Sequence, residues 1–204
     1  MHVILVHGFF NRGGILGRLA AHLVRAGHTC YTPTLKPFDA RNGLPDLSTK
    51  LDEYISQNLP ADTRFALVGF SMGAIVCRHY FQKLSGAQRV LAFYSIAGPH
   101  EGTWTAYFYP SMGVRQLRRG SRFLRELNDS ADEMPSIPVT CYWTPIDLMI
   151  CPVSSARWVK GEAVCIPTLM HSLLIFNKKL HVDIAERLSA ISPDEALIQG
   201  GLKV

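Results

Sequence analysis

The sequence predicts an α/β fold with a mostly parallel sheet of about six strands and helices on both faces. Short runs that are apolar throughout alternate with segments whose apolar residues recur every three or four positions, which is the spacing of a helix. Strands that are apolar on both sides are typical of a parallel sheet covered by helices on each face. The chain has 204 residues, 48% hydrophobic and 18% charged, and this suits one domain with a large core.

The apolar runs and the helical spacing assign the individual elements. The expected strands cover residues 3–6, 28–31, 65–68, 90–96, 139–143 and 164–166. The expected helices cover about residues 14–26, 47–55, 74–84 and 180–191. Asp46 or Ser48 is the expected N-cap of the second helix, since short polar side chains accept hydrogen bonds from free helical N–H groups.

The segment 99–129 breaks the alternation of strands and helices. It contains a cluster of aromatic residues, and two of its glycines, Gly113 and Gly120, interrupt a single helical pattern. We therefore expect a lid-like excursion between two strands, with two short helices. Because the chain shows no internal repeat and no linker, residues 1–204 are expected to form a single domain.

Composition and charge exclude several classes of protein. The excess of five positive charges is small for a nucleic-acid-binding protein, and no basic stretch alternates with stacking aromatics. No apolar stretch has the length of a transmembrane helix, and the first residues lack the basic start and cleavage site of a secretory leader. The five cysteines form no Cys-x-x-Cys pair and no cluster with histidine, so we expect free thiols, a cytoplasmic protein and no metal site.

The segment Gly69-Phe70-Ser71-Met72-Gly73 fits the pattern Gly-x-Ser-x-Gly and lies between an expected strand and an expected helix. The two glycines permit a tight turn that lifts the serine hydroxyl above the edge of the sheet. The following helix places its free N–H groups beside any negative charge that develops there. Ser71 is therefore the predicted nucleophile.

A serine hydroxyl needs a base to take its proton, and four histidines follow Ser71. His171 lies in the expected loop between the last strand and the last helix, where a base can reach the edge of the sheet. His79 falls inside the helix after the serine, and His100 has too little chain before it for an acid-bearing strand. His181 opens the last helix at an expected surface position. These features favour His171 as the base, with a structural histidine as the alternative.

The acid that orients the base is expected to follow a strand between the serine and the histidine. Asp147 comes a short turn after the expected strand 139–143, so its carboxylate can fix the tautomer of the imidazole. Asp129 and Asp132 lie in a polar turn that is typical of a helix end. Asp147 is therefore the predicted acid, and Asp129 is the second candidate.

Acyl transfer also needs hydrogen-bond donors for the oxyanion. The backbone N–H of Met72, directly after the serine, is the first expected donor. The second is expected from the loop after the first strand, where Gly8 lets the backbone turn and leaves the N–H of Phe9 as the predicted partner. His7 lies in the same loop and is expected to make a structural hydrogen bond.

The order of these landmarks resembles the α/β-hydrolase superfamily, and within it the small bacterial triacylglycerol lipases and esterases. The likeness spans nearly the whole chain and includes the His-Gly loop, the Ser71 turn, the segment 97–103, Asp147 and His171. It implies hydrolysis of carboxylic, lipid-like esters through a serine acyl-enzyme, without a cofactor, and a lid or wall after Gly102. The two leading strands of larger relatives are missing here, which implies a minimal sheet.

Aromatic side chains are the candidate contacts for an acyl chain. Trp104, Tyr107 and Phe108 lie near the expected site, and they either pack the excursion onto the sheet or contact the acyl group. Some proteins of the resembling family have extra glycines where this chain has Phe9 and Phe10. Phe9 and Phe10 are therefore expected to make the mouth of the acyl groove narrower and more apolar, and Phe10 is a candidate contact for the substrate.

Five arginines follow the aromatic cluster with no acidic residue between them: Arg115, Arg118, Arg119, Arg122 and Arg125. Their number equals the excess positive charge of the chain. They predict either a solvated helix face or a patch that contacts anionic lipid, a membrane surface or a phosphate-bearing substrate.

Other functions stay open at this point. The same three side chains can cleave thioesters or amides instead of esters. The fold can also serve as a non-catalytic module that binds a lipid or a protein, and a membrane-binding module rests on the arginine and aromatic segment alone. The presence of a serine, an acid and a histidine in the right order favours an enzyme.

Overall fold

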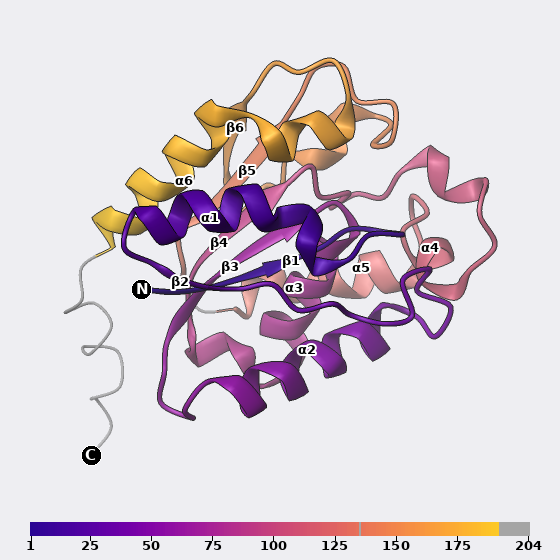
Figure 1. The fold of residues 1–204 in the computed structure, drawn as a ribbon. Coiled ribbons are helices and arrows are strands. Elements are labelled where there is room, and N and C mark those ends of the chain that lie inside the picture. Colours follow the sequence, from indigo (N-terminus) through magenta and orange to yellow (C-terminus); the bar gives the residue numbers. More distant parts are fainter. Residues whose placement is uncertain (135, 192–204) are drawn as a thin grey trace.

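The computed structural model describes residues 1–134 and 136–191, and a six-stranded parallel sheet lies at its centre (Figure 1). The strands are β1 (His2–Val6), β2 (Thr29–Tyr31), β3 (Phe65–Phe70), β4 (Val90–Ile96), β5 (Val139–Trp143) and β6 (Glu162–Cys165). They lie in the order β2-β1-β3-β4-β5-β6, and every neighbouring pair is parallel. All six strands therefore end at one edge, where the segments that follow them meet. The predicted fold class is confirmed.

Helices cover both faces of this sheet. Figure 1 shows α1 (Gly17–Arg25) and α6 (Lys178–Ala190) on one face, and α2 (Leu44–Asn58) and α3 (Met72–Lys83) on the other. Side chains alternate between the two faces along each strand, so β1 contributes Val3 to the core under α1 and α6 and Ile4 to the core under α2 and α3. Burial on both faces explains why the strand sequences are apolar throughout.

The start of α2 differs from the expected one. The N-cap is Gly43, Leu44 begins the helix, and the N–H of Leu44 donates to Oε1 of Gln116 at 2.7 Å. The expected N-cap residues Asp46 and Ser48 lie inside the helix instead. The hydroxyl of Ser48 is buried and donates to backbone carbonyls of α2 and α3. The free N–H group at the start of α2 is therefore capped by Gln116, which is distant in the sequence, and not by a local side chain.

The excursion after β4 contains the two expected short helices, α4 (Met112–Gln116) and α5 (Arg122–Asp129), and a 3₁₀ turn at Trp104–Tyr107. Backbone hydrogen bonds tie it to its surroundings, including one of 2.9 Å from Gly113 N to Ala40 O. The expected single domain over residues 1–204 includes positions 135 and 192–204, which lie outside the described residues. No helix among the described residues is both long and apolar enough to cross a membrane.

We predict that Gly73→Ala lowers the free energy of unfolding by about 1–3 kcal/mol, the usual cost of overpacking a core. A Cβ atom on Gly73 would lie 2.4 Å from the carbonyl oxygen of Val6, so the backbones of α3 and β1 would have to separate. Urea unfolding of the purified variant measures the loss.

Gly17→Ala is the matched control, because Gly17 begins α1 with a helical φ of −59° and a Cβ atom there meets nothing within 4 Å. This variant is expected to be as stable as the wild type or slightly more stable. Equal stability of both variants and the wild type would contradict the close contact at Gly73.

Candidate active site

Ser71 occupies a strained turn between β3 and α3. Its φ of 53° and ψ of −123° lie outside the regions that a serine normally adopts. Two backbone hydrogen bonds hold the turn: Ser71 N donates to Ile96 O at 2.8 Å, and Ala74 N donates to Ser71 O at 3.0 Å. This strand, sharp turn and helix are the structural context that exposes a nucleophile at the edge of the sheet.

The glycines on either side of Ser71 are required by close backbone contacts. A Cβ atom on Gly69 would lie 2.4 Å from Cα of Ala74, and one on Gly73 would meet the main chain of β1. Gly8, in the loop after β1, passes so close that its Cβ atom would lie 3.1 Å from that of Ser71. The Gly-x-Ser-x-Gly pattern thus reflects a crowded junction of two strands and a helix.

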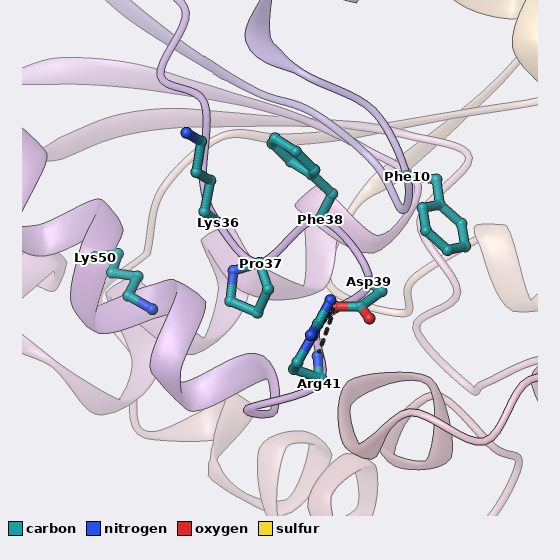
Figure 2. A pocket seen from close by; sticks show the side chains of 7 residues that line it. All are labelled: Phe10, Lys36, Pro37, Phe38, Asp39, Arg41 and Lys50. Carbon is teal, nitrogen blue, oxygen red and sulfur yellow. Dashed lines mark hydrogen bonds and ion pairs between the residues drawn. The ribbon is translucent and has the colours of Figure 1, made fainter.

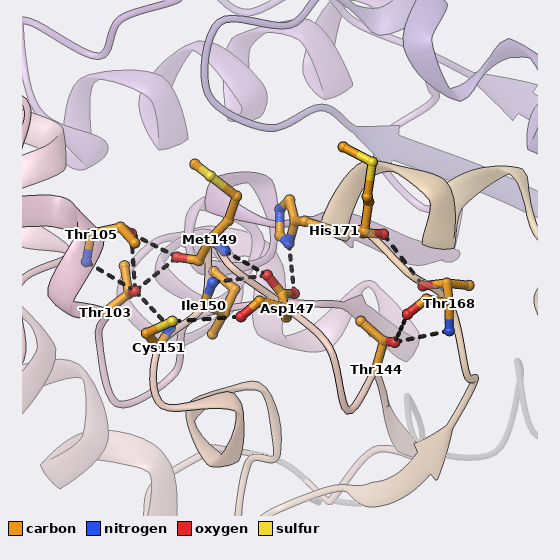
Figure 3. Close-up of polar contacts among 10 residues, drawn as sticks. Thr103, Thr105, Thr144, Asp147, Met149, Ile150, Cys151, Thr168 and His171 are labelled. Carbon is orange, nitrogen blue, oxygen red and sulfur yellow. Dashed lines mark hydrogen bonds and ion pairs between the residues drawn. The ribbon is translucent and has the colours of Figure 1, made fainter.

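Asp147 and His171 are joined by a hydrogen bond of 2.8 Å between Oδ2 and Nδ1 (Figure 3). The other carboxylate oxygen, Oδ1, accepts the backbone N–H groups of Met149 at 2.8 Å and Ile150 at 2.9 Å. Burial acts to raise the pKa of Asp147, but the hydrogen bond and charge of His171 and the two backbone donors outweigh it, and the pKa lies below its usual value. The carboxylate is therefore fixed and ionised behind the imidazole.

The imidazole of His171 lies beside the end of β3. Its ring centroid is 4.9 Å from that of Phe70, the residue directly before Ser71. Since Nδ1 faces the carboxylate, Nε2 is the ring atom left to face a substrate, and it has no hydrogen-bond partner among the described residues. No hydrogen bond joins Ser71 and His171 in this part of the chain, and such contacts commonly tighten only when substrate binds.

The two predicted oxyanion donors, Phe9 and Met72, lie on the same cavity as Ser71. Met72 is the first residue of α3, so its N–H has no acceptor within the helix. Phe9 follows Gly8, and the next residue, Phe10, is anchored by a 2.9 Å hydrogen bond from its N–H to Phe38 O. This arrangement is compatible with both donors, and their assignment stays a prediction.

His7 holds the loop after β1 in place, as expected for a structural residue. Its Nδ1 contacts Gly8 O at 2.9 Å, and its Nε2 accepts the N–H of Leu35 at 2.9 Å. These partners require the proton on Nδ1, and burial lowers the pKa of this histidine, so it stays neutral. Its ring is fully engaged in joining the loops after β1 and β2.

An apolar cavity of about 360 Å³ opens beside Ser71. Its lining residues come from the loop after β1, the turn into α3, the excursion and the loop of Asp147: Phe9, Ser71, Met72, Pro99, Thr103, Thr105, Ala106, Phe108, Tyr109, Val114, Leu117, Met149 and Ile150. Three of these side chains carry a hydroxyl on serine or threonine, one is a tyrosine, and the rest are apolar. The cavity can therefore accommodate an aliphatic chain next to the candidate nucleophile.

Two threonines fasten the excursion to the loop of Asp147, and sequence reasoning missed them. Thr103 and Thr105 both donate from Oγ1 to Met149 O, at 2.8 and 2.6 Å, and Cys151 N donates to Thr103 Oγ1 at 2.9 Å (Figure 3). The excursion is thus a fixed wall where it meets the acid. The Thr-x-Thr spacing after Gly102 is the only sequence signal for this contact, and it does not reveal the partner.

The predicted acyl contacts take different positions. Phe108 lines the cavity, whereas Phe10 lines a neighbouring hollow of about 400 Å³ together with Lys36, Pro37, Phe38, Asp39, Arg41 and Lys50 (Figure 2). Trp104 and Tyr107 lie outside the cavity lining, because the 3₁₀ turn directs Ala106 inward. Their rings lie under the guanidinium groups of Arg119 and Arg118, at 5.7 and 4.7 Å.

The arginine cluster is only partly free for a ligand. Arg122 pairs with Glu126 within α5, and Arg125 donates to Gly120 O. Arg118 donates to Ala106 O. Arg115, Arg122 and Arg125 are nevertheless exposed, so the cluster remains positively charged surface.

The histidines and the aspartate that were not predicted as the base or the acid make structural contacts or are exposed. His79 stacks on Phe123, and His100 is fully buried with its Nε2 hydrogen-bonded to Ser95 Oγ at 2.8 Å. Asp129 lies exposed at the end of α5. The expectation that His181 lies at the surface is wrong, because α6 packs against the sheet and His181 is buried, with Nε2 donating to Ile175 O at 2.7 Å.

Residues 3–143, more than two thirds of the chain, match the palmitoyl protein thioesterase family. The chain belongs to that family. Members of the family are hydrolases, so the match and the sheet together confirm the resemblance to the α/β-hydrolases. No curated protein matches the chain. Among the described residues there is no group of three histidine, cysteine or acidic side chains that could hold a metal ion.

Solved structures of lipases share the fold at low sequence identity. The mature form of lipase BlEst2 from Bacillus licheniformis is 15% identical, with a TM-score of 0.72, and the alignment covers 91% of this chain and 90% of the lipase. Lipase B from Aspergillus fumigatus is 17% identical, with a TM-score of 0.81 over 96% of this chain. The alignment covers 54% of that lipase, so this chain spans about half its length.

We predict that replacing Asp147 by Asn destabilises the fold more at neutral pH than near pH 3. Folding lowers the pKa of this carboxyl from 3.8, so the ionised group stabilises the native state above about pH 4. That contribution is lost as the pH falls through the native pKa. We expect a loss on the order of 1–3 kcal/mol at pH 7, typical for a hydrogen bond to a charged group.

Urea unfolding of the wild type and the variant at both pH values measures this difference. Asp129→Asn is the control, because Asp129 is exposed and no hydrogen bond or ion pair to it is seen in the described chain. A destabilisation by Asp147→Asn that is the same at both pH values would contradict an ionised carboxylate in the native state.

Proposed function

We propose that this protein is a serine hydrolase that cleaves carboxylic esters with apolar, lipid-like acyl groups through an acyl-enzyme. One observation carries the proposal. The cavity beside Ser71 is also lined by Met149 and Ile150, whose N–H groups hold the carboxylate that hydrogen-bonds His171. The serine hydroxyl, the backbone that holds the carboxylate behind the imidazole, and an apolar binding space therefore lie together at the edge of the sheet.

In the proposed reaction, Ser71 Oγ attacks the carbonyl carbon while Nε2 of His171 takes the hydroxyl proton. Asp147 keeps the proton of His171 on Nδ1, so Nε2 is the basic atom, and its negative charge stabilises the imidazolium that forms. The strained turn at Ser71 aims the hydroxyl away from the sheet, which presents it to the carbonyl. These three side chains supply proton transfer without a cofactor.

The tetrahedral oxyanion would accept hydrogen bonds from the N–H groups of Phe9 and Met72. The N-terminus of α3 adds the positive end of a helix dipole at the same place. His171 then gives its proton to the leaving group, and the ester bond breaks to leave the acyl group on Ser71. Water attacks the acyl-enzyme while His171 takes a proton from it. The bond between the acyl carbon and Ser71 Oγ then breaks, His171 returns the proton to Oγ, and the acid is released.

A thioester is the second candidate substrate, and the family match favours it. The reaction needs no change in the residues, because a thiol replaces the alcohol as the leaving group and the same imidazole protonates it. The apolar cavity suits a long acyl chain in either substrate. An amide is a harder substrate because an amine is a poorer leaving group.

We predict that Ser71→Ala removes all measurable turnover of acyl esters and acyl thioesters and all labelling by a serine-directed fluorophosphonate. The reason is that no other hydroxyl occupies the strained turn. A panel of p-nitrophenyl esters and matched acyl thioesters of increasing chain length measures the activity, with the corresponding anilides for amide cleavage. Wild-type turnover in the variant would disprove the serine mechanism, and equal thermal unfolding would show that the loss is not misfolding.

We predict that Asp147→Asn lowers kcat by about 10⁴-fold, because an asparagine favours the wrong tautomer of the histidine. Asp129→Asn is expected to keep wild-type kcat, since Asp129 lies exposed at the end of α5. Steady-state kinetics on one p-nitrophenyl ester at pH 8 distinguish the two acids. A large loss in the Asp129 variant with full activity in the Asp147 variant would reassign the acid.

A further inference from the structure

Large apolar side chains are exposed at one edge of the sheet. The described residues include fourteen large apolar side chains that are exposed, and eleven of them follow the carboxyl ends of β1, β4, β5 and β6. We call these eleven the apolar rim: Phe10, Trp104, Tyr107, Phe108, Met112, Ile146, Leu148, Met149, Leu169, Met170 and Leu173. Only Val24, Val159 and Val182 lie elsewhere.

The segments that carry the apolar rim are in direct contact with each other. The ring of Phe10 lies 5.4 Å from that of Tyr109 in the excursion, and Trp104 N donates to Cys151 O in the loop of Asp147 at 2.9 Å. The loop of Asp147 is joined to the loop of His171 by the hydrogen bond between those two side chains. Figure 1 shows the loop after β1 and the excursion around α4 together on one side of the sheet.

The rim overlaps the lining of the cavity beside Ser71. Phe108 and Met149 belong to both, since each lines the cavity and is also exposed, Phe108 to 88%. Leu148 directly follows Asp147 and is 76% exposed. Leu169 precedes His171 by two residues and is 72% exposed. Large apolar side chains that are exposed together at one place mark an interaction site.

The charge at this edge matches an anionic partner. The segments that follow β1, β2, β4, β5 and β6 are residues 7–16, 32–43, 97–121, 144–156 and 166–177. They carry six arginines and lysines and three acidic residues. One of those acids is Asp147, which is buried against His171 and takes no part in the surface field.

We propose that this edge of the protein docks on the surface of a lipid bilayer that contains anionic lipids. The apolar rim inserts into the boundary between headgroups and acyl chains, while the surrounding arginines and lysines contact the headgroups. The cavity then opens directly onto the lipid. Docking needs only these surface side chains and does not depend on the serine chemistry proposed above.

Docking is tested with the full chain carrying Ser71→Ala, so that no lipid is hydrolysed. Sedimentation with phosphatidylcholine vesicles, with and without added phosphatidylglycerol, measures the bound fraction. We expect anionic vesicles to bind the protein about tenfold more tightly or better, and added salt to weaken this binding. The pair Leu148→Ser and Leu169→Ser is expected to weaken binding by about tenfold or more.

The matched control is the pair Val24→Ser and Val159→Ser. These two side chains are also exposed, Val159 to 89%, but Val24 lies on α1. Val159 lies close to Gly161, which packs against Val139 at the opposite end of β5. The control pair is expected to bind vesicles like the parent, with unchanged thermal unfolding in both pairs.

Three results would overturn the proposal. One is the absence of vesicle binding, and another is an equal effect of the two pairs. The third is a dimer in light scattering that only the rim pair dissociates, because a second copy of the chain would then cover the rim. Loss of catalysis in the Ser71 variant has no bearing on these outcomes.

Discussion

The close approach of α3 to the ends of β1 and β3 is the constraint on which the candidate site depends. At Gly69 and Gly73 the backbones are too close for any side chain, and Ser71 between them is held at a φ of 53°. Such a conformation costs on the order of 1–3 kcal/mol, which the hydrogen bonds of the turn and the packing of α3 offset. The helix therefore presents Ser71 at a fixed position instead of leaving it to a flexible loop.

The same kind of strain recurs along this edge of the sheet. The described residues contain four non-glycine positions with positive φ, namely Phe10, Ala40, Ser71 and Ala97, and they follow β1, β2, β3 and β4 in turn. Hydrogen bonds between segments hold the others as well: Phe10 N donates to Phe38 O, and Ala97 N donates to Tyr142 O. The turns at this edge are thus hydrogen-bonded to neighbouring segments. These contacts hold the backbone around Ser71 in one geometry.

The sequence predicts the parts of this structure that depend on local pattern. The parallel sheet follows from apolar strands, and the pairing of Asp147 with His171 follows from the position of each after a strand. Contacts that no motif marks were not predictable, because a threonine that bonds a carbonyl has the same local sequence as one that faces water. For that reason the contact of Thr103 with Met149 O and the capping of α2 by Gln116 emerged only from the structure.

The apolar rim and the cavity are connected, because they have two residues in common. An ester or thioester with a long acyl chain is held within lipid by the hydrophobic effect, and carrying that chain through water to the cavity beside Ser71 would cost free energy for every exposed methylene. A protein whose cavity mouth is bordered by Phe108 and Met149 lets the chain pass from lipid to cavity along apolar surface. Exposed apolar side chains reduce solubility, and their concentration at the edge of the sheet that carries the cavity is explained if this surface is covered by lipid while the protein works.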